Sequence, residues 1–448
     1  MYADVEIISK NSYKFSIFTY KVPESLINQV VIGSIVNVNF RNKVYRAVVI
    51  DIKSNTKIQN IKNINNITNF VLSKDQLLYL KYISLSNYLN IGIVLNSNFD
   101  IHNFVKQKKI KKGVLHNLSF DQFNSMKFNK KNVFYVSSLK EANELNKILT
   151  KKIKIDFYQK FGGRNEILNI TNNKKYTNII VLNTNFEKII IEEDTDYFFY
   201  NSNLNSYKLP SLNNMNIVES AYLKQLIFNG NFYFVNEFPN LEFFNNSFKF
   251  NNYVHFDIEY FVSSTIKNSF QLLKNKYKNI TLNAYSNEKL NVYRQVNQIE
   301  KLNDKSLNCL ILINPTIVTN NILNSYKVIY LLRLLNYFKN NNLKIFVISN
   351  KDLDINKTLN SAKFNDWIIN EQRTRQLYGP NLLMKIFSIT SDSELTIQDS
   401  NYIIGPIKEN NLYKYELQIK LNNNINYLEY RKIFANFQNY KIKRIRFI

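Results

Sequence analysis

The residues of this chain best suited to metal chemistry form an acidic cluster behind an apolar run. The run K-I-I-I at 188–191 precedes four carboxylates, those of Glu192, Glu193, Asp194 and Asp196. We predict buried strands over 178–183 and 188–192, so that the carboxylates stand where a strand ends. In nucleotide-driven motors, carboxylates at such a place hold the magnesium ion that is bound to the phosphates. The cluster therefore has the outline of a motor site.

The chain lacks the glycine pattern that such a motor needs. None of its 8 glycines stands in a G-x-x-x-x-G-K-[ST] or a G-x-G-x-x-G frame. Backbone amides of a glycine-rich loop, a lysine and a serine or threonine cradle triphosphate and magnesium. Without that cradle the carboxylates have little to hold. We interpret the cluster as a vestigial strand end or a helix N-terminal cap, with ATP hydrolysis as the alternative.

Other catalytic or metal-binding patterns are missing as well. The histidines, His102, His116 and His255, have no neighbouring ligands, and no G-x-S-x-G frame occurs. The single cysteine, Cys309, lies in an apolar run, which excludes an intramolecular disulfide and a cysteine-based zinc site. We expect no metal site and no covalent nucleophile.

The composition bounds the class of protein. Lys and Arg number 59 against 34 Asp and Glu, which leaves a formal charge of +25 and favours a polyanionic partner such as nucleic acid. A merely solvated basic surface is the alternative. The 45% of hydrophobic residues excludes a largely disordered chain. No apolar span or signal pattern stands out, so we expect a cytoplasmic protein without a membrane partner.

The first hundred residues favour a small antiparallel β module. Period-two alternation predicts strands over 6–9, 13–20, 33–40 and 45–52. A capping sequence at 73–76, S-K-D-Q, then starts a helix that reaches about Tyr88. The residues that follow, 101–130, include the run K-Q-K-K-I-K-K and are predicted to be a basic linker.

Two α/β units and a smaller C-terminal domain follow. The first unit has predicted strands at 132–136, 153–157, 178–183, 188–192 and 232–235, with a helix at 139–149. The second has them at 280–282, 309–313, 328–331 and 343–348. Such alternation predicts parallel sheets with flanking helices. The C-terminal domain combines helices at 366–375 and 427–438, strands at 383–389, 413–421 and 440–448, and a turn at Gly405 and Pro406. The expected domains are 1–100, 131–245, 246–365 and 366–448.

Three separated stretches resemble the primosomal protein N′ (PriA) family of replication-restart helicases. Residues 18–24 read F-T-Y-K-V-P-E and 33–40 read G-S-I-V-N-V-N-F, similar to the family's F-D-Y-x-V-P and G-x-x-V-x-V-P-F. Residues 80–95 resemble its W-x-A-x-Y-Y-x-x-x-x-G-x-V-L helix. The acidic cluster lies where the family has V-D-E-E-H-D, and Y-K-L-P at 207–210 is similar to P-R-Y-H. Near the C-terminus, 370–380 resembles E-R-x-x-x-x-Y-P-P, I-G-P resembles L-G-P, and Y-K-Y-E-L resembles Y-R-W-Q-L.

The resemblance implies an α/β multidomain protein with a β-rich DNA-binding domain at its N-terminus, two RecA-like helicase lobes and a C-terminal α+β domain. The chain departs from the family at three places. The phosphate loop expected between 105 and 130, the paired cysteines of a zinc module and the element Q-x-x-G-R-A-G-R have no counterpart. Both lobes are therefore expected to be degenerate. ATP and magnesium would be cofactors only in an intact motor, and zinc is not expected.

The family takes the 3′ end of a nascent DNA strand around its F-D-Y motif and the following glycine strand. The corresponding candidates here are Phe18, Thr19, Tyr20, Gly33 and Lys62. Thr19 replaces the family's acid, and Phe18 and Tyr20 are alternatively ordinary strand residues with one buried face. The C-terminal candidates for DNA contact are the cations Lys414, Lys441, Lys443, Arg444 and Arg446. An edge strand that charge keeps from aggregating is the alternative there.

These observations lead to three hypotheses. The first is a PriA-like protein that has lost its ATPase, binds forked or 3′-ended DNA and helps to assemble a replication-restart complex. Its partners would be single-stranded or duplex DNA, a single-stranded-DNA-binding protein and the loader of the replicative helicase. The second is an active ATP-dependent 3′–5′ helicase with an unrecognisable phosphate loop. The third is a protein-interaction factor without DNA binding.

Overall fold

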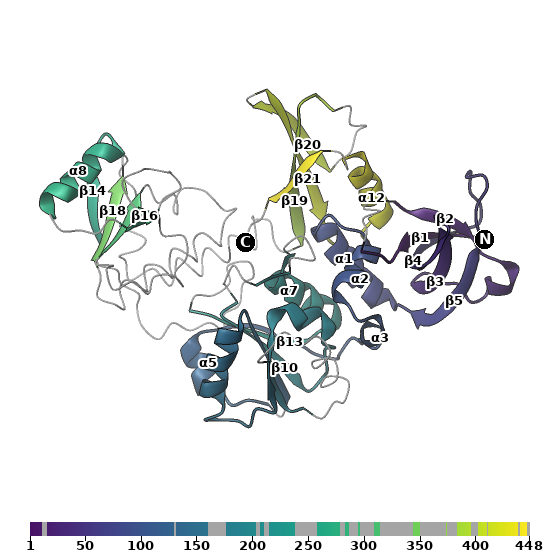
Figure 1. The fold of residues 1–448 in the computed structure, drawn as a ribbon, viewed down its shortest axis with the longest axis horizontal. Helices are drawn as coiled ribbons and strands as arrows, with labels where there is room; N and C mark the ends of the chain where they lie inside the picture. The colour runs from purple at the N-terminus through teal and green to yellow at the C-terminus, as the bar shows by residue number, and fades with distance from the viewer. Residues whose placement is uncertain are drawn as a thin grey trace. The chain divides into compact units, whose positions relative to one another are not determined.

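The computed structural model divides the chain into two compact units. The first comprises Met1–His116, Ser125–Val235 and Leu382–Ile445, and the second comprises Asn117–Asn124, Asn236–Asn381 and Arg446–Ile448. Within these units the structure describes residues 1–10, 16–129, 131–159, 176–202, 207–209, 215–237, 258–277, 283–285, 294–295, 309–313, 344–349, 373, 383–395, 402–409, 411–437 and 440–445. Figure 1 shows the elements of these parts.

The N-terminal residues form the antiparallel β module that the alternation predicts. Its strands are β1 (Tyr2–Ile7), β2 (Phe18–Lys21), β3 (Ser34–Phe40), β4 (Lys43–Lys53) and β5 (Ile64–Val71), with the short 3₁₀ helix η1 (Glu24–Leu26). They pair in the order β2-β1-β4-β3-β5, and every pairing is antiparallel. The strand β5 escaped the sequence prediction, because its exposed positions are mostly asparagines.

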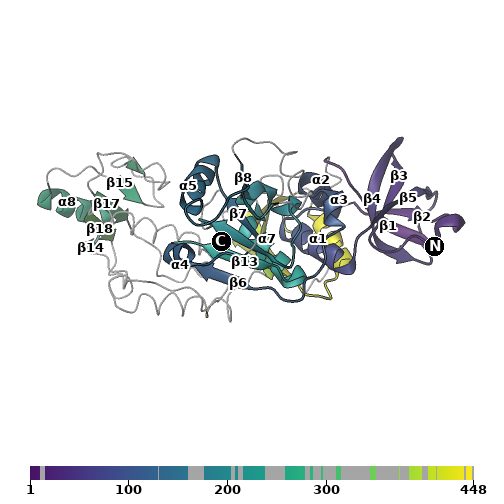
Figure 2. The same cartoon turned by 90° about the horizontal axis from the view of Figure 1, so that it is seen from below.

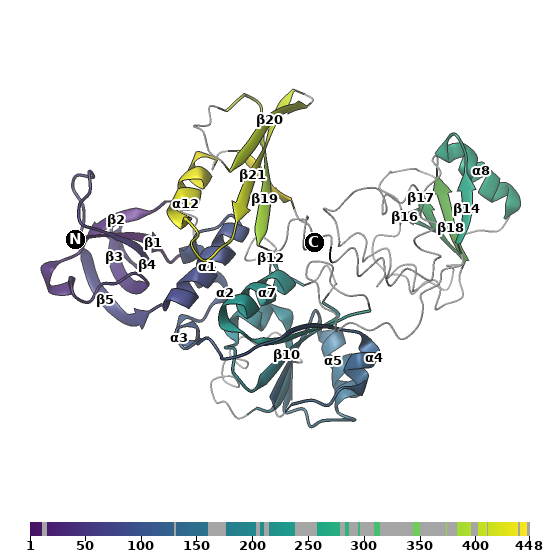
Figure 3. The same cartoon turned by 180° about the vertical axis from the view of Figure 1, so that it is seen from behind.

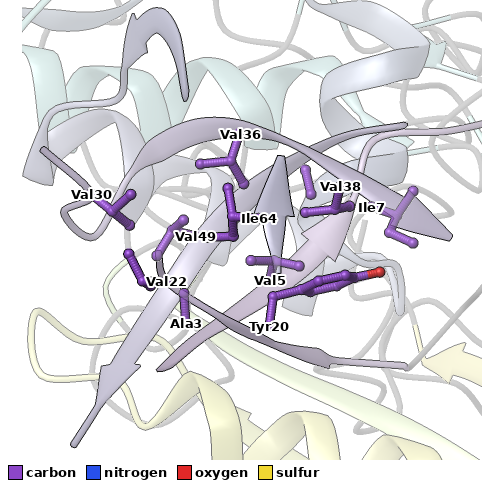
Figure 4. Packing of buried hydrophobic residues seen from close by; sticks show 11 residues of the cluster. Ala3, Val5, Ile7, Tyr20, Val22, Val30, Val36, Val38, Val49 and Ile64 are labelled. Atoms are coloured by element: carbon purple, nitrogen blue, oxygen red, sulfur yellow. The ribbon is translucent and has the colours of Figure 1, made fainter. Parts of the chain in front are cut away.

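The β module curls around an aliphatic core. Val5, Val36 and Val49 point inward from three strands, and the ring of Tyr20 covers one side of the cluster (Figure 4). The edge strand β2 meets the residues just before β5 where the backbone amide of Lys21 donates to the carbonyl of Lys62 at 2.9 Å. The sheet is therefore closed at this point, which protects its edges.

Three helices follow the β module. They are α1 (Lys74–Ser86), α2 (Ile91–Asn98) and α3 (Ile101–Phe104). The predicted start of α1 is confirmed: the hydroxyl of Ser73 accepts from the amide of Gln76, and the side chain of Gln76 accepts from the amide of Ser73 at 2.8 Å. This reciprocal cap satisfies two amide donors that have no partner inside the helix.

A six-stranded sheet forms the core of the next part of the chain. Its order is β6-β13-β10-β7-β9-β8, and the five strands from β13 to β8 run parallel. The strands are β6 (Leu115–Leu118), β7 (Lys131–Val136), β8 (Phe157–Tyr158), β9 (Asn178–Leu182), β10 (Thr195–Tyr200) and β13 (Asn231–Val235). The accompanying helices are α4 (Phe120–Ser125), α5 (Leu139–Leu149), η2 (Asn183–Lys188) and α7 (Ile217–Phe228). A short antiparallel pair joins β11 (Lys208–Leu209) and β12 (Met215–Asn216). Figure 2 shows α5 and α7 beside the strands.

A second parallel sheet lies in the second unit. Its order is β14-β18-β17-β15-β16, and every pairing in it is parallel. The described elements are β14 (Ile258–Val262), α8 (Ile266–Lys276), β15 (Asn283–Tyr285), β16 (Arg294–Gln295), β17 (Cys309–Ile313) and β18 (Lys344–Ser349). The parallel sheets expected for the two α/β units are thus confirmed.

The C-terminal elements form a four-stranded antiparallel sheet with one helix. The sheet has the order β20-β21-β19-β22 and consists of β19 (Met384–Ser391), β20 (Ile403–Glu409), β21 (Leu412–Lys420) and β22 (Lys441–Ile445). The helix α12 (Tyr427–Asn436) lies beside it (Figure 3). The rings of Phe387 and Phe434 meet there, with centroids 6.0 Å apart.

Several sequence predictions need correction. The strand predicted over 188–192 is wrong, because η2 ends at Lys188 and the following residues form no strand. The predicted linker at 101–130 contains α3, β6 and α4, and Gly405 and Pro406 lie inside β20. The strands predicted at 280–282 and 328–331 fall outside the described residues, as does the helix at 366–375 except for Arg373. The predicted domain boundaries stay predictions.

Candidate nucleic-acid interface

The acidic cluster lies at the amino end of a strand. Glu193 and Asp194 occupy the exposed turn before β10, and Glu192 forms an ion pair with Lys131 at the start of β7. Because β7 and β10 run parallel, their amino ends lie at the same edge of the sheet. Open parallel sheets bind their ligands at the opposite edge, outside the carboxyl ends of the strands. The sequence predicted that these carboxylates follow the carboxyl end of a strand, and the structure shows that this prediction is wrong. The carboxyl end of β10 is followed by Asn201 and Ser202, which carry no charge.

Asp196 belongs to a polar row across four parallel strands. The register aligns Asn178, Asn132, Asp196 and Asn231 on β9, β7, β10 and β13. The side-chain Nδ2 of Asn132 donates to Asn178 Oδ1, and the side-chain Nδ2 of Asn129 donates to Asp196 Oδ2, both at 2.6 Å. Asp196 is only 1% exposed, and this burial raises the pKa of its carboxyl to about 6. The carboxylate of Asp196 therefore makes its contacts inside the sheet and is not accessible to solvent.

The glycine of the segment where a phosphate loop was expected has a packing role. A Cβ atom on Gly113 would lie 1.7 Å from the carbonyl oxygen of Asn229. Only glycine permits such a close approach of two backbones. Among the described residues, no group of three or more His, Cys, Asp or Glu side chains is placed to hold a metal ion.

An aromatic rim forms at one end of the β module. It consists of Phe18, Phe40 and Tyr45, with ring centroids 4.6 Å apart for Phe18 and Phe40 and 6.3 Å apart for Phe40 and Tyr45. All three side chains are half-buried, so each keeps an accessible part. Half-buried rings of this kind can stack on nucleic-acid bases of any sequence.

The β3–β4 hairpin carries a cation to this rim. Arg41 and Asn42 form its two-residue turn, with φ of +46° and +61°. A two-residue hairpin turn of this kind requires positive φ at both positions, so the turn itself accounts for the conformation of Arg41. The exposed guanidinium of Arg41 lies 5.4 Å from the ring centroid of Phe40. A cation and an aromatic face are therefore presented together.

Besides Phe18, the structure places one predicted residue beside the aromatic rim, and a second elsewhere on the β module. Tyr20 is buried, and its hydroxyl donates to the carbonyl of Asn39, next to Phe40, at 3.1 Å. Burial raises the pKa of Tyr20, so its hydroxyl remains protonated. Lys62 is exposed, and its backbone closes the β module against Lys21. Phe18 and Tyr20 are therefore the part of the predicted site that the structure brings together around Phe40.

Thr19 lies on the other face of β2. Its hydroxyl donates to Asp4 Oδ1 at 2.7 Å, and Lys53 forms an ion pair with the other oxygen of that carboxylate. Asp4 faces Thr19 across the β1–β2 ladder. The prediction from the sequence overlooked Asp4, although it alternates with the inward residues Ala3 and Val5 on β1. A carboxylate therefore stands beside Thr19, supplied by the neighbouring strand.

Gly33 immediately precedes β3, whereas Phe40 ends that strand. Its φ is +95°, and a Cβ atom would lie 2.3 Å from the carbonyl oxygen of Leu72. The structure thus explains this glycine by backbone conformation and close packing, and separates it from the aromatic rim.

The predicted C-terminal strand is confirmed as β22, an edge strand paired with β19. Lys441, Lys443 and Arg444 belong to it, and Lys414 is half-buried on β21. Arg446 falls outside the described residues. Lys441, Lys443 and Arg444 therefore belong to an edge strand of the C-terminal sheet. They are distant in sequence from the residues of the aromatic rim.

Comparison with known proteins concerns the N-terminal part. Residues 8–99 match the family model of the PriA 3′DNA-binding domain (3′BD). The match covers β2 to β5, α1 and α2, and includes the aromatic rim. No curated protein was found to match the chain. None of the helices that the structure describes is long and apolar enough to cross a membrane.

Proposed function

We propose that this protein binds the 3′ end of a DNA strand with its N-terminal β domain and acts in DNA replication restart. The match of residues 8–99 to the PriA 3′DNA-binding domain carries the proposal. The aromatic rim supports it, because an end base exposes a face on which aromatic side chains stack without regard to sequence. The charge of +25 supports a polyanionic partner.

Each candidate residue of the β module has a role in this proposal. Phe18 and Phe40 stack on the end base, while Arg41 and Lys62 neutralise backbone phosphates. Tyr20 holds the end of β3 through its hydrogen bond to Asn39. Thr19 and Gly33 act on the domain's own conformation, since their contacts are made to Asp4 and Leu72.

The remainder of the chain extends the proposal. We assign to the C-terminal sheet a second DNA contact through Lys414, Lys441, Lys443, Arg444 and Arg446. The two parallel sheets would be degenerate helicase lobes that act as a spacer and a docking surface. Their partners would be a single-stranded-DNA-binding protein and the loader of the replicative helicase. The absence of a phosphate-loop frame supports the loss of ATP hydrolysis.

Fluorescence anisotropy with two forked DNAs tests the proposed function. The DNAs share one sequence and differ only in whether the 3′ end at the junction is free or closed in a hairpin loop. We expect tighter binding of the free end. Phe18→Ala should weaken it by about 1–3 kcal/mol, the range for the loss of one stacked base. Phe157→Ala removes a half-buried ring from β8 and is the matched control.

The outcome of this comparison is decisive for the 3′ end. Equal affinity for the open and the closed fork would contradict 3′-end recognition, even with tight binding overall. An equal loss of DNA affinity in Phe18→Ala and Phe157→Ala would show that the aromatic rim is not part of the DNA-binding site. Absence of DNA binding would favour the protein-interaction hypothesis.

An active ATP-dependent helicase is the second candidate function. The observation that favours it is the presence of two parallel sheets in one chain, because parallel sheets with helices are the architecture on which nucleotide sites are commonly built. DNA-stimulated ATP hydrolysis separates it from the first proposal.

A further inference from the structure

The segment between α3 and β6 carries a dense run of positive charge. Residues 106–112 read K-Q-K-K-I-K-K, which places five lysines within seven positions. This segment, here called the lysine strap, connects α3 with β6 and forms no helix or strand (Figure 2). All five lysines are exposed. Seven residues span at most about 25 Å even when fully extended, so five positive charges share a short stretch of the surface.

The two other residues of the lysine strap fix its backbone to the first compact unit. The side chain of Gln107 accepts from the amide of Ile191 at 2.7 Å and is only 4% exposed. The carbonyl of Gln107 accepts from Gln76 Nε2, at the start of α1, at 2.8 Å. The carbonyl of Ile110 accepts from Asn229 Nδ2 at 2.9 Å. The strap is therefore attached both to the helix that follows the β module and to the parallel sheet.

The attachment points determine where the lysines stand. Gln107, Ile110 and Gly113 are held at every third position, and the backbone at Gly113 packs tightly against Asn229. The lysines between these points stand in two adjacent pairs, 108–109 and 111–112. The strap therefore presents its charges from a backbone that is already ordered.

The positive charges of the lysine strap are not neutralised within the described parts of the chain. None of the five lysines forms an ion pair there. Glu192 follows the attachment point Ile191, but it pairs with Lys131 at the start of β7. Glu193 and Asp194 are exposed and form no ion pair with the strap. The strap thus keeps an excess of positive charge beside this acidic turn.

Adjacent charges of one sign repel each other, and a bound polyanion relieves this repulsion. A lysine ammonium is a compact point charge that contacts phosphate without a fixed orientation. Because the backbone of the strap is held before binding, little further entropy is lost when the partner binds. These properties fit a regular row of phosphates, such as the backbone of a nucleic-acid strand.

We infer that the lysine strap binds the phosphate backbone of DNA, without regard to base sequence or to a 3′ end. The strap lies outside residues 8–99, which match the 3′DNA-binding domain, so this contact is additional to the aromatic rim. The inference rests on the proposed function for the choice of DNA as the polyanion. It does not depend on the recognition of the 3′ end.

The test uses the full chain and fluorescein-labelled forks whose 3′ end is open or closed by a hairpin loop. Two double variants remove two charges each from the strap: Lys108→Gln with Lys109→Gln, and Lys111→Gln with Lys112→Gln. The matched control, Lys147→Gln with Lys151→Gln, removes two exposed lysines at the end of α5. Fluorescence anisotropy over a range of salt concentrations measures affinity, and thermal midpoints equal to that of the wild type establish that the variants are folded.

Each strap variant should reduce the slope of log K against log salt by about 1.4 to 1.8. This range is twice the value for one phosphate on a single strand or on a duplex. At 0.1 M salt the affinity should fall by about 25-fold or more, if the difference vanishes at 1 M salt. The loss should be the same for the open and the closed fork, and the control should keep the slope of the wild type.

Two outcomes would overturn the inference. Strap variants that bind both forks as tightly as the wild type would leave the lysines to solvent or to an acidic protein. Losses that equal those of the Lys147 and Lys151 control would show that only the overall charge matters.

The proposed function fails separately from this inference. Equal binding of the open and closed forks by the wild type contradicts 3′-end recognition, whereas a selective loss in the strap variants still supports the backbone contact. Conversely, tighter binding of the open fork together with unchanged strap variants supports the proposed function and overturns the inference.

Discussion

Four buried acids of the first compact unit are compensated in two ways. Three of them form ion pairs with buried cations: Glu6 with Arg431, Glu187 with Lys224, and Glu219 with Lys385. Asp196 accepts from the neutral amide of Asn129 within a row of asparagines. An amide offsets less of the cost of burying a charge than a cation does. Asp196 is therefore the buried acid whose protonation should respond to pH near neutrality.

Asp196 predicts a pH-dependent contribution to stability. The folded protein holds the proton up to a pKa of about 6, whereas the unfolded chain releases it near 3.8. The folded state thus binds more protons between these values, and the free energy of unfolding falls as the pH rises through this window. The variant Asp196→Asn has no carboxyl at this position, so its unfolding free energy should not fall with pH through this window. At pH 7.5 it should raise the unfolding free energy by at most about 3 kcal/mol, with little difference below pH 4, measured by urea denaturation.

Asp194→Asn provides the matched control for this prediction. Asp194 is exposed in the turn just before β10, so its replacement should leave the pH profile unchanged. A variant at position 196 that is less stable than the wild type at pH 7.5 would show that the carboxylate stabilises the sheet in its charged form.

At the scale of elements, α12 is fastened to the β module by a buried polar network. Arg431 Nε donates to Glu6 Oε1 at 3.0 Å, and the hydroxyl of Tyr427 donates to the same oxygen at 2.9 Å. Glu6 Oε2 accepts from the backbone amide of Ile91 at 2.6 Å, and Arg431 Nη1 donates to the carbonyl of Leu89 at 3.2 Å. One carboxylate therefore joins β1, the start of α2 and α12.

Breaking this network should destabilise the first unit strongly. Arg431→Ala leaves the carboxylate of Glu6 buried without its cation, which costs about 3–5 kcal/mol. The double variant Glu6→Leu with Arg431→Met replaces both charges by apolar groups and should lose less than the sum of the single changes. Chemical denaturation measures both. Lys432→Ala, at the exposed neighbouring position, should change stability by less than about 0.5 kcal/mol. Additive losses in the double variant would contradict a coupled pair.

Elements with local signals were predictable from the sequence. The helix α5 has the predicted bounds, and the hydroxyl of Ser138 accepts from the amide of Glu141 at its start. The K-I-I-I run misled the prediction because an apolar run reports burial: Ile189 and Ile191 are each 3% exposed, yet neither lies in a strand. Hydrogen-bond partners come from elsewhere in the chain, so strand membership could not be inferred from these residues alone.

The candidate site was predictable only in part for a similar reason. Phe18, Tyr20 and Phe40 lie in recognisable motifs, whereas Tyr45 joins the aromatic rim through the pairing of β3 with β4. Asp4 reaches Thr19 through the pairing of β1 with β2. Contacts across a ladder depend on register, and register depends on turns and core packing that single residues do not reveal.

At the scale of the whole molecule, the chain contains two parallel sheets, and its sequence has no phosphate-loop frame. Glu192, Glu193 and Asp194 precede the amino end of β10, Asp196 lies just inside it, and Gly113 serves packing. Phosphoryl transfer depends on positioning phosphates, magnesium and water together. Sheets alone do not supply this positioning.

We therefore expect no ATP hydrolysis above background, with or without forked DNA. A coupled phosphate-release assay at saturating ATP measures it, and the variant with alanine at Glu192 and Glu193 should be indistinguishable from the wild type. DNA-stimulated hydrolysis that this variant abolishes would contradict the loss of the motor and would return the acidic cluster to a catalytic role.

The pair formed by Glu6 and Arg431 also sets an order for biogenesis. Its partners are 425 positions apart, and a ribosome adds about 5–20 residues per second. The first strand thus waits about 20–90 s in the cell before its arginine is synthesised. During this interval the nascent N-terminal domain carries an acid without its counter-charge. The contact of β1 with α12 can become native only after residue 431 has been translated, and until then its residues on β1 are open to chaperones.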